Sequence, residues 1–126
     1  MAGVDTNVLI RLIVADNAGQ TASAEAFVEG GAWVPLIALA ETIGVLKASY
    51  GFSTTQLNGA IDMLLNHATL TLQDPDVVAA ALEQYRLRPA LGFSDCLILE
   101  AARKATHLPI GTFDRDFAKL PGTQRI

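Results

Sequence analysis

The sequence has little cysteine, histidine or aromatic content, and these shortages exclude several classes of protein. Its single cysteine, Cys96, cannot form an internal disulfide, and one cysteine with two histidines makes a Cys/His zinc site hard to build. No uncharged run approaches about 18 residues, and no basic segment followed by an apolar stretch opens the chain. We therefore expect neither membrane spanning nor export, and we expect the chain in the cytoplasm.

Positive charge is also scarce, because nine basic residues face 13 acidic ones and the net charge is −4. Proteins that bind nucleic acids usually carry a basic surface. If four of the acids are metal ligands, however, the remaining acids and the basic residues are equal in number. A metal-bound acidic cluster can itself attract phosphate through its cations. Net charge therefore neither supports nor excludes an RNA partner.

The chain is rich in apolar residues, which make up 51% of 126 positions and suffice for one core. Short strand-like segments alternate with helical patterns, without repeats or low-complexity tracts. The predicted strands are 2–4, 32–34, 69–72, 110–113 and 123–126, and the predicted helices are 8–13, 21–29, 35–49, 54–66, 75–86 and 94–105. This alternation predicts crossover connections and hence an α/β fold with a mainly parallel sheet covered on both faces. We expect a single domain over residues 1–126.

Several helix ends and surfaces carry specific signals. Ser53 and Gln56 have the spacing of a capping box, which predicts a helix from residue 54. Ser94 is positioned to cap the helix that follows it. On that helix, Glu100 and Lys104 have the spacing of an ion pair, and we expect them on its outer face.

Four acidic residues occupy positions where ligands gather in parallel sheets. Asp5 follows the first strand, Asp114 follows the strand at 110–113, Asp95 begins a helix, and Glu41 interrupts an apolar helix. Each has an ordinary explanation as well. Asp5 can be a helix cap, and Glu41 can lie on a solvent-exposed polar stripe of its helix. The dipole of its helix favours a negative charge at Asp95, and Asp114 can form a surface turn. Together they indicate one site, because carboxyl ends of parallel strands share one edge of the sheet.

Carboxylates that converge without a counter-ion repel one another, so an ionised cluster requires cations. Ligand sets made only of oxygen select hard ions such as Mg²⁺ or Mn²⁺ over zinc or copper. Such ions lower the pKa of a bound water and stabilise both oxygens in a displacement at phosphorus. The chemistry that this pattern predicts is phosphodiester hydrolysis.

Four sequence blocks resemble the motifs of PIN-domain proteins, especially VapC-type toxins, and they occur in the family's order. The blocks are VDTNVLIR at 4–11, LAE at 39–41, FSDCLI at 93–98 and GTFDRDF at 111–117. The resemblance covers nearly the whole chain. It implies a three-layer α/β/α fold around a mainly parallel central sheet.

The resemblance also implies a set of functional residues. Metal ligands carry over to Asp5, Glu41, Asp95 and Asp114, with Asp116 assisting. Polar side chains that orient the carboxylates or water carry over to Thr6, Asn7, Ser94 and Thr112. Whether Asp114 or Asp116 is the main fourth ligand stays open. The activity implied is that of a Mg²⁺- or Mn²⁺-dependent endoribonuclease, which forms a homodimer and is held inactive by an antitoxin protein.

Three other interpretations share part of this pattern. A receiver domain also has an acidic pocket at the edge of a parallel sheet, but it requires adjacent acids after the first strand, where Asp5 is single. A phosphatase of the haloacid-dehalogenase type requires a second aspartate at position 7, which is Asn7. A catalytically inactive PIN-like module that only binds partners is the third, and the presence of all four acids disfavours it.

Overall fold

The computed structural model describes all 126 residues, and the chain divides into two compact units, Met1–Pro75 (unit 1) and Asp76–Ile126 (unit 2). Each unit combines helices with strands, and every pair of strands is parallel. The prediction of an α/β fold with a parallel sheet flanked by helices is confirmed. None of the helices combines the length and the hydropathy that a membrane span requires.

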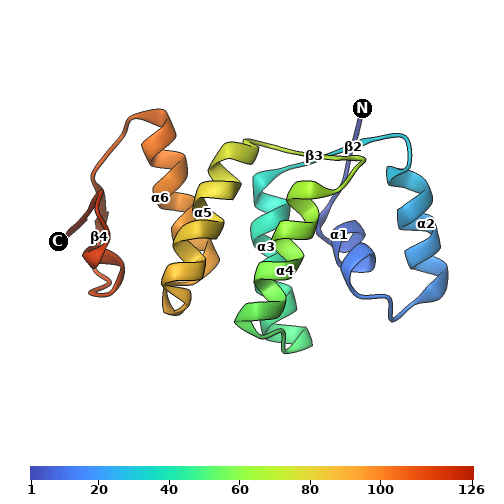
Figure 1. Ribbon diagram of the computed structural model, residues 1–126, viewed down its shortest axis with the longest axis horizontal. Helices are drawn as coiled ribbons and strands as arrows, with labels where there is room; N and C mark the ends of the chain where they lie inside the picture. The colour runs from blue at the N-terminus through green and yellow to red at the C-terminus, as the bar shows by residue number, and fades with distance from the viewer. The chain divides into compact units, whose positions relative to one another are not determined.

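Unit 1 contains a three-stranded sheet in the order β1-β2-β3 (Figure 1). Its strands are β1 (Ala2–Gly3), β2 (Ala32–Val34) and β3 (Leu70–Leu72), and its helices are α1 (Thr6–Ile13), α2 (Ala18–Val28), α3 (Leu36–Tyr50) and α4 (Thr54–Asn66). Helices α1 and α2 connect β1 to β2, and helices α3 and α4 connect β2 to β3. Because the strands are parallel, their carboxyl ends share one edge, and α1 and α3 both begin there.

The end of α3 and the start of α4 follow from local sequence, and the start of α4 was predicted. Gly51 has a φ of 65° and ends α3 in the left-handed conformation, which glycine adopts without a steric penalty. Ser53 and Gln56 form the capping box, because each side chain accepts a hydrogen bond from the backbone N–H of the other. The core of unit 1 is formed mainly by fully buried leucine and isoleucine side chains, among them Leu9, Leu39, Leu46, Leu57, Ile61 and Leu64.

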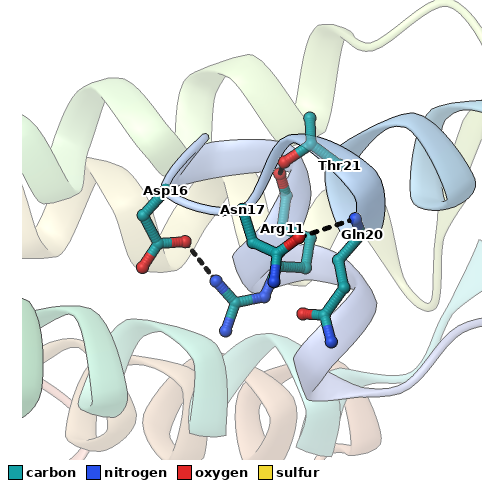
Figure 2. Close-up of polar contacts among 5 residues, drawn as sticks. All are labelled: Arg11, Asp16, Asn17, Gln20 and Thr21. Atoms are coloured by element: carbon teal, nitrogen blue, oxygen red, sulfur yellow. Dashed lines mark hydrogen bonds and ion pairs between the residues drawn. The ribbon is translucent and has the colours of Figure 1, made fainter.

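The connection between α1 and α2 is held by side chains that the sequence patterns did not single out (Figure 2). Asn17 accepts a hydrogen bond from the backbone N–H of Gln20 at 3.0 Å, so α2 begins earlier than the predicted Thr21. Arg11 forms an ion pair with Asp16. The Thr21 hydroxyl donates to the backbone carbonyl of Arg11 at 3.2 Å. These bonds tie the end of α1 to the start of α2.

Unit 2 contains two helices, two short 3₁₀ turns and a two-stranded sheet. These elements are α5 (Pro75–Leu87), which starts at the boundary with unit 1, η1 (Pro89–Leu91), α6 (Phe93–Ala105), β4 (Ile110–Thr112), η2 (Phe117–Lys119) and β5 (Thr123–Arg125). Tyr85 of α5 and Phe93 of α6 pack edge to face, with ring centroids 6.0 Å apart and an angle of 64° between the rings. This contact lies in the apolar core of the unit, where both side chains are buried.

The predicted cap of α6 is wrong. The helix begins at Phe93, so Ser94 lies inside its first turn and caps nothing. The residue at the cap position is Gly92, whose φ of 78° no other residue adopts easily. The backbone geometry of a glycine, and not a side-chain hydrogen bond, therefore sets the start of this helix.

The predicted outward pair of Glu100 and Lys104 is also wrong. Glu100 is buried, and it accepts hydrogen bonds from Arg103 Nε at 3.2 Å and from Gln84 Nε2 at 3.3 Å. Lys104 forms an ion pair with Asp76 at 3.1 Å instead. The helix face that carries Glu100 is turned toward the core of unit 2, where a charged side chain requires partners.

Candidate functional site

Asp5 is the N-cap of α1 and lies at the carboxyl end of β1. Its Oδ1 accepts a hydrogen bond from the backbone N–H of Val8 at 3.1 Å, so the explanation as a helix cap is correct. The side chain is exposed, and the cap uses only one of its two carboxylate oxygens. Capping therefore leaves Asp5 a second oxygen for a ligand.

Glu41 lies in the middle of α3, and its side chain is exposed. Its Oε2 accepts a hydrogen bond from the hydroxyl of Thr6, in the first turn of α1, at 3.0 Å. Asp5, Thr6 and Glu41 line one pocket of about 250 Å³. The other residues of its wall are Val4, Pro35, Ile37 and Ala38. The carboxyl edge of the sheet in unit 1 thus brings two of the predicted acids and one predicted orienting hydroxyl together.

Asn7 does not share this pocket. It lines a separate and mainly apolar groove of about 320 Å³ along α1 and α2, together with Val8, Arg11 and Phe27 among others. Successive residues of a helix point in different directions, so Thr6 and Asn7 serve different surfaces.

In unit 2, Asp95 and Asp114 affect one another electrostatically. Asp95 is half-buried in the first turn of α6. Burial, and next the negative charge of Asp114, raise the pKa of the Asp95 carboxyl above its usual value. Repulsion of this kind is expected between carboxylates that share a cation.

Asp114 is held firmly in a turn after β4. Its Oδ1 accepts hydrogen bonds from the backbone N–H groups of Asp116 at 2.8 Å and Phe117 at 3.1 Å. Its own backbone N–H donates to the hydroxyl of Thr112 at 3.0 Å. The expected surface turn is thus present, and Thr112 helps to fix it. Asp116 instead forms an exposed ion pair with Lys119 at 3.3 Å.

The two remaining polar candidates in this region differ from the acids. Ser94 is exposed in the first turn of α6 and makes no side-chain hydrogen bond. Cys96 is fully buried, and burial together with the charges of Asp95 and Glu100 raises the pKa of its thiol to about 11. At neutral pH this thiol stays protonated, so Cys96 is not equipped to act as a nucleophile.

The donors in each unit suit a hard divalent cation, because they are carboxylate and hydroxyl oxygens without a sulfur ligand. Within each unit the acids gather in twos, Asp5 with Glu41 and Asp95 with Asp114. No group of three or more Asp, Glu, His or Cys residues within a unit is close enough to hold a metal ion. The donor chemistry fits Mg²⁺ or Mn²⁺, and each unit by itself supplies half of the predicted ligand set.

Two exposed apolar residues beside these acids were not predicted. Phe113, expected as the last residue of a strand, follows the end of β4, and its side chain is 79% exposed. Ile37 is 71% exposed and lines the pocket of Asp5 and Glu41. The signal for Phe113 was its place directly before Asp114. Ile37 had no such signal, because the first part of α3 is apolar on every side.

The family model of the PIN domain matches residues 3–122, which include parts of both units and all of the predicted acids. No match was found among curated proteins or among solved structures. PIN domains are generally nucleases and typically use divalent metal ions. A parallel α/β architecture, acids at the carboxyl ends of strands and a match over nearly the whole chain agree, and the chain belongs to the PIN domain family.

Proposed function

We propose that this chain is a metal-dependent endoribonuclease in which Asp5, Glu41, Asp95 and Asp114 hold Mg²⁺ or Mn²⁺. The observation that carries the proposal is that Asp5 and Glu41 line one pocket at the carboxyl edge of a parallel sheet. The effect of the Asp114 charge on Asp95 supports a second pair in unit 2. We also propose that the two units form one nuclease domain over residues 1–126. The continuous family match through both units supports this.

Divalent cations held by these carboxylates would lower the pKa of a bound water and stabilise the attacking and leaving oxygens at phosphorus. The chain's own contribution is to hold the ligands in place beforehand. Thr6 donates its hydroxyl hydrogen to Glu41, and Thr112 anchors the turn that carries Asp114. Such supporting hydrogen bonds fix the direction of a ligand, and their loss usually weakens metal binding or activity.

Asp114 is proposed as the main fourth ligand, and Asp116 as an assisting residue. The carboxylate of Asp114 acts on Asp95 through its charge, whereas that of Asp116 is engaged by Lys119. Of the orienting residues carried over from the family, Thr6 and Thr112 have the supporting hydrogen bonds. Asn7 and Ser94 remain proposals that rest on the family motif alone.

We further propose that the chain is the toxin of a toxin-antitoxin pair, acting on cytoplasmic RNA as a homodimer. The support is the order of the four sequence blocks that resemble VapC-type toxins. In this proposal an antitoxin protein covers the acidic residues and blocks RNA. Induced expression in a bacterial host should arrest growth with the wild-type chain and should not with Asp5→Asn.

The decisive test is cleavage of a mixed cellular RNA pool by the purified chain with Mg²⁺, with Mn²⁺ and with EDTA. Amide variants suit this test, because asparagine also caps helices and each amide oxygen still accepts the bonds seen here. Asp5→Asn and Glu41→Gln therefore remove charge while the fold is kept. We expect metal-dependent cleavage that both variants lose, with circular dichroism spectra like that of the wild type.

A matched pair in unit 2 completes the test. Asp114→Asn should abolish cleavage, whereas Asp116→Asn removes an assisting carboxylate that Lys119 already engages and should retain most of it. RNA cleavage that survives in EDTA, or in Asp5→Asn, would contradict the metal-dependent mechanism. A folded chain that cleaves no RNA with either metal would favour a PIN-like binding module.

A further inference from the structure

Phe113 is an aromatic side chain that the fold does not use for packing. It is 79% exposed, and the one aromatic ring pair of the chain joins Tyr85 and Phe93. Its neighbours in sequence are Thr112, which anchors the turn, and Asp114, a proposed metal ligand. Single exposed apolar side chains are common on protein surfaces, so exposure by itself assigns no role. What sets Phe113 apart is its place directly before a proposed metal ligand.

The backbone around Phe113 is fixed on both sides. The hydrogen bond from the N–H of Asp114 to the Thr112 hydroxyl spans this residue at 3.0 Å. Asp114 in turn accepts hydrogen bonds from the two N–H groups that follow in the turn. A ring on such a clamped segment loses little freedom when a ligand binds, which favours binding.

Little side-chain bulk precedes Phe113, and charged residues follow it. Phe113 comes directly after the end of β4, two residues after Gly111. Gly111 has no side chain, and Ile126, 64% exposed, lies next to it. Arg115, two residues after Phe113, is exposed and has no ion-pair or hydrogen-bond partner. Three consecutive residues thus present an exposed aromatic ring (Phe113), a carboxylate (Asp114) and an unpaired guanidinium (Arg115).

We propose that Phe113 stacks on an unpaired RNA base next to the scissile bond and that Arg115 contacts an adjacent phosphate. This inference rests on the proposed nuclease function, and it assigns the residues that position its substrate. Aromatic rings stack on any base that is free of its duplex, and arginine neutralises backbone phosphate. A protein partner is disfavoured at Phe113, because docking surfaces are contiguous apolar patches and this ring is followed by three charged residues.

The test uses binding without catalysis, in the Asp5→Asn background with Mg²⁺ present. A fluorescein-labelled single-stranded RNA of mixed sequence and the same RNA as a duplex are titrated, with fluorescence anisotropy as the readout. Phe113→Ala should weaken single-strand binding roughly 5- to 100-fold, as loss of one stacked base does, with a much smaller effect on the duplex. Phe113→Tyr should bind like the parent.

Two controls separate stacking from other effects. Phe113→Leu keeps an apolar side chain of similar size without a π-face, and it should lose binding as Phe113→Ala does. Phe27→Ala removes another exposed ring, one that lines the groove along α1 and α2, and it should leave RNA binding unchanged. Arg115→Gln should reduce the slope of log affinity against log salt by about 0.7, the value for one single-strand phosphate contact.

The outcomes distinguish this inference from the proposed function. Equal binding of single-stranded RNA by Phe113→Leu, Phe113→Ala and the parent would overturn the stacking role even if the wild type cleaves RNA. Unchanged RNA binding together with a loss of dimer in Phe113→Ala would assign the ring to a protein contact and also overturn it. Phe113-dependent binding by a wild-type chain that cannot cleave would retain the stacking role and remove the nuclease.

Discussion

The two units hold their acid pairs by different means. In unit 1, Asp5 and Glu41 are exposed and receive hydrogen bonds from neutral donors, a backbone N–H and the Thr6 hydroxyl. In unit 2, Asp95 is half-buried, and burial and the charge of Asp114 both raise the pKa of its carboxyl. Asp114 receives backbone N–H hydrogen bonds as Asp5 does. The difference therefore lies in Asp95, which carries an electrostatic penalty that a bound cation would remove.

This difference gives the proposed ligands different chemistry. Hydrogen bonds already direct oxygens of Asp5, Glu41 and Asp114, whereas Asp95 offers a negative charge without a cationic partner. Mg²⁺ is usually bound by one or two carboxylates, and waters and substrate phosphates complete its coordination. Whether the two pairs serve one site or two is therefore a question for combined variants.

The largest expected effect comes from combining one variant of each pair. Asp5→Asn and Asp114→Asn should each reduce RNA cleavage at least about 100-fold, more than the loss of an orienting partner usually does. If both serve one site, the double variant should be hardly worse than either single variant, because residues that act as a unit are not additive. The measurement is the initial rate at which the wild type, the two single variants and the double variant cleave one labelled RNA.

The control for this cycle pairs Asp5→Asn with Asp116→Asn, whose carboxylate is engaged by Lys119 and is proposed only to assist. That double variant should be no worse than Asp5→Asn. If the losses of Asp5→Asn and Asp114→Asn multiply instead, the two pairs act independently, and the idea of one shared site fails.

A smaller effect is expected from the two supporting hydroxyls, one in each unit. Thr6→Val removes the donor to Glu41, and Thr112→Val removes the acceptor of the Asp114 backbone N–H. Each should lower cleavage about 10- to 100-fold at limiting metal, since the loss of a residue that hydrogen-bonds a metal ligand has effects of this size. The dependence of rate on Mg²⁺ concentration is the measurement.

Serine variants provide the rescue. Thr6→Ser and Thr112→Ser keep the hydroxyl and should retain most of the activity. If Thr6→Val behaves like Thr6→Ser, the hydroxyl of Thr6 does not orient Glu41 in function, and the preorganisation attributed to unit 1 is wrong.

The sequence predicted the fold well where local signals decide the structure. The capping box at Ser53 and the parallel α/β alternation are both present in the structure. The sequence-based prediction failed at the start of α6. Ser94 has the chemistry of a cap, but the positive φ of Gly92 places the start of α6 before it.

The candidate site was predicted in part. The sequence placed Asp5 and Glu41 at one edge of a sheet, and they line one pocket. It also gave each acid an ordinary structural explanation, and for Asp5 and Asp114 that explanation is correct. A carboxylate can cap a turn and bind a ligand at the same time, and residue patterns do not separate the two roles. The partner of Glu41 and the exposure of Phe113 depend on tertiary packing, which no short motif encodes.

The smallest expected effect compares one arginine–carboxylate pair in each unit. Arg103 pairs with Glu100, whose side chain is only 8% exposed, whereas Arg11 pairs with Asp16, whose side chain is 47% exposed. Arg103→Met keeps the aliphatic stem and leaves a buried charge, so it should lower the free energy of unfolding by about 1–3 kcal/mol. Arg11→Met breaks a solvated pair and should lower it by less than about 1 kcal/mol. Urea denaturation measures both changes in the free energy of unfolding, provided that its slope against urea concentration is the same in wild type and variants. Equal losses would mean that Gln84 already satisfies Glu100, and that buried charge does not distinguish unit 2 from unit 1.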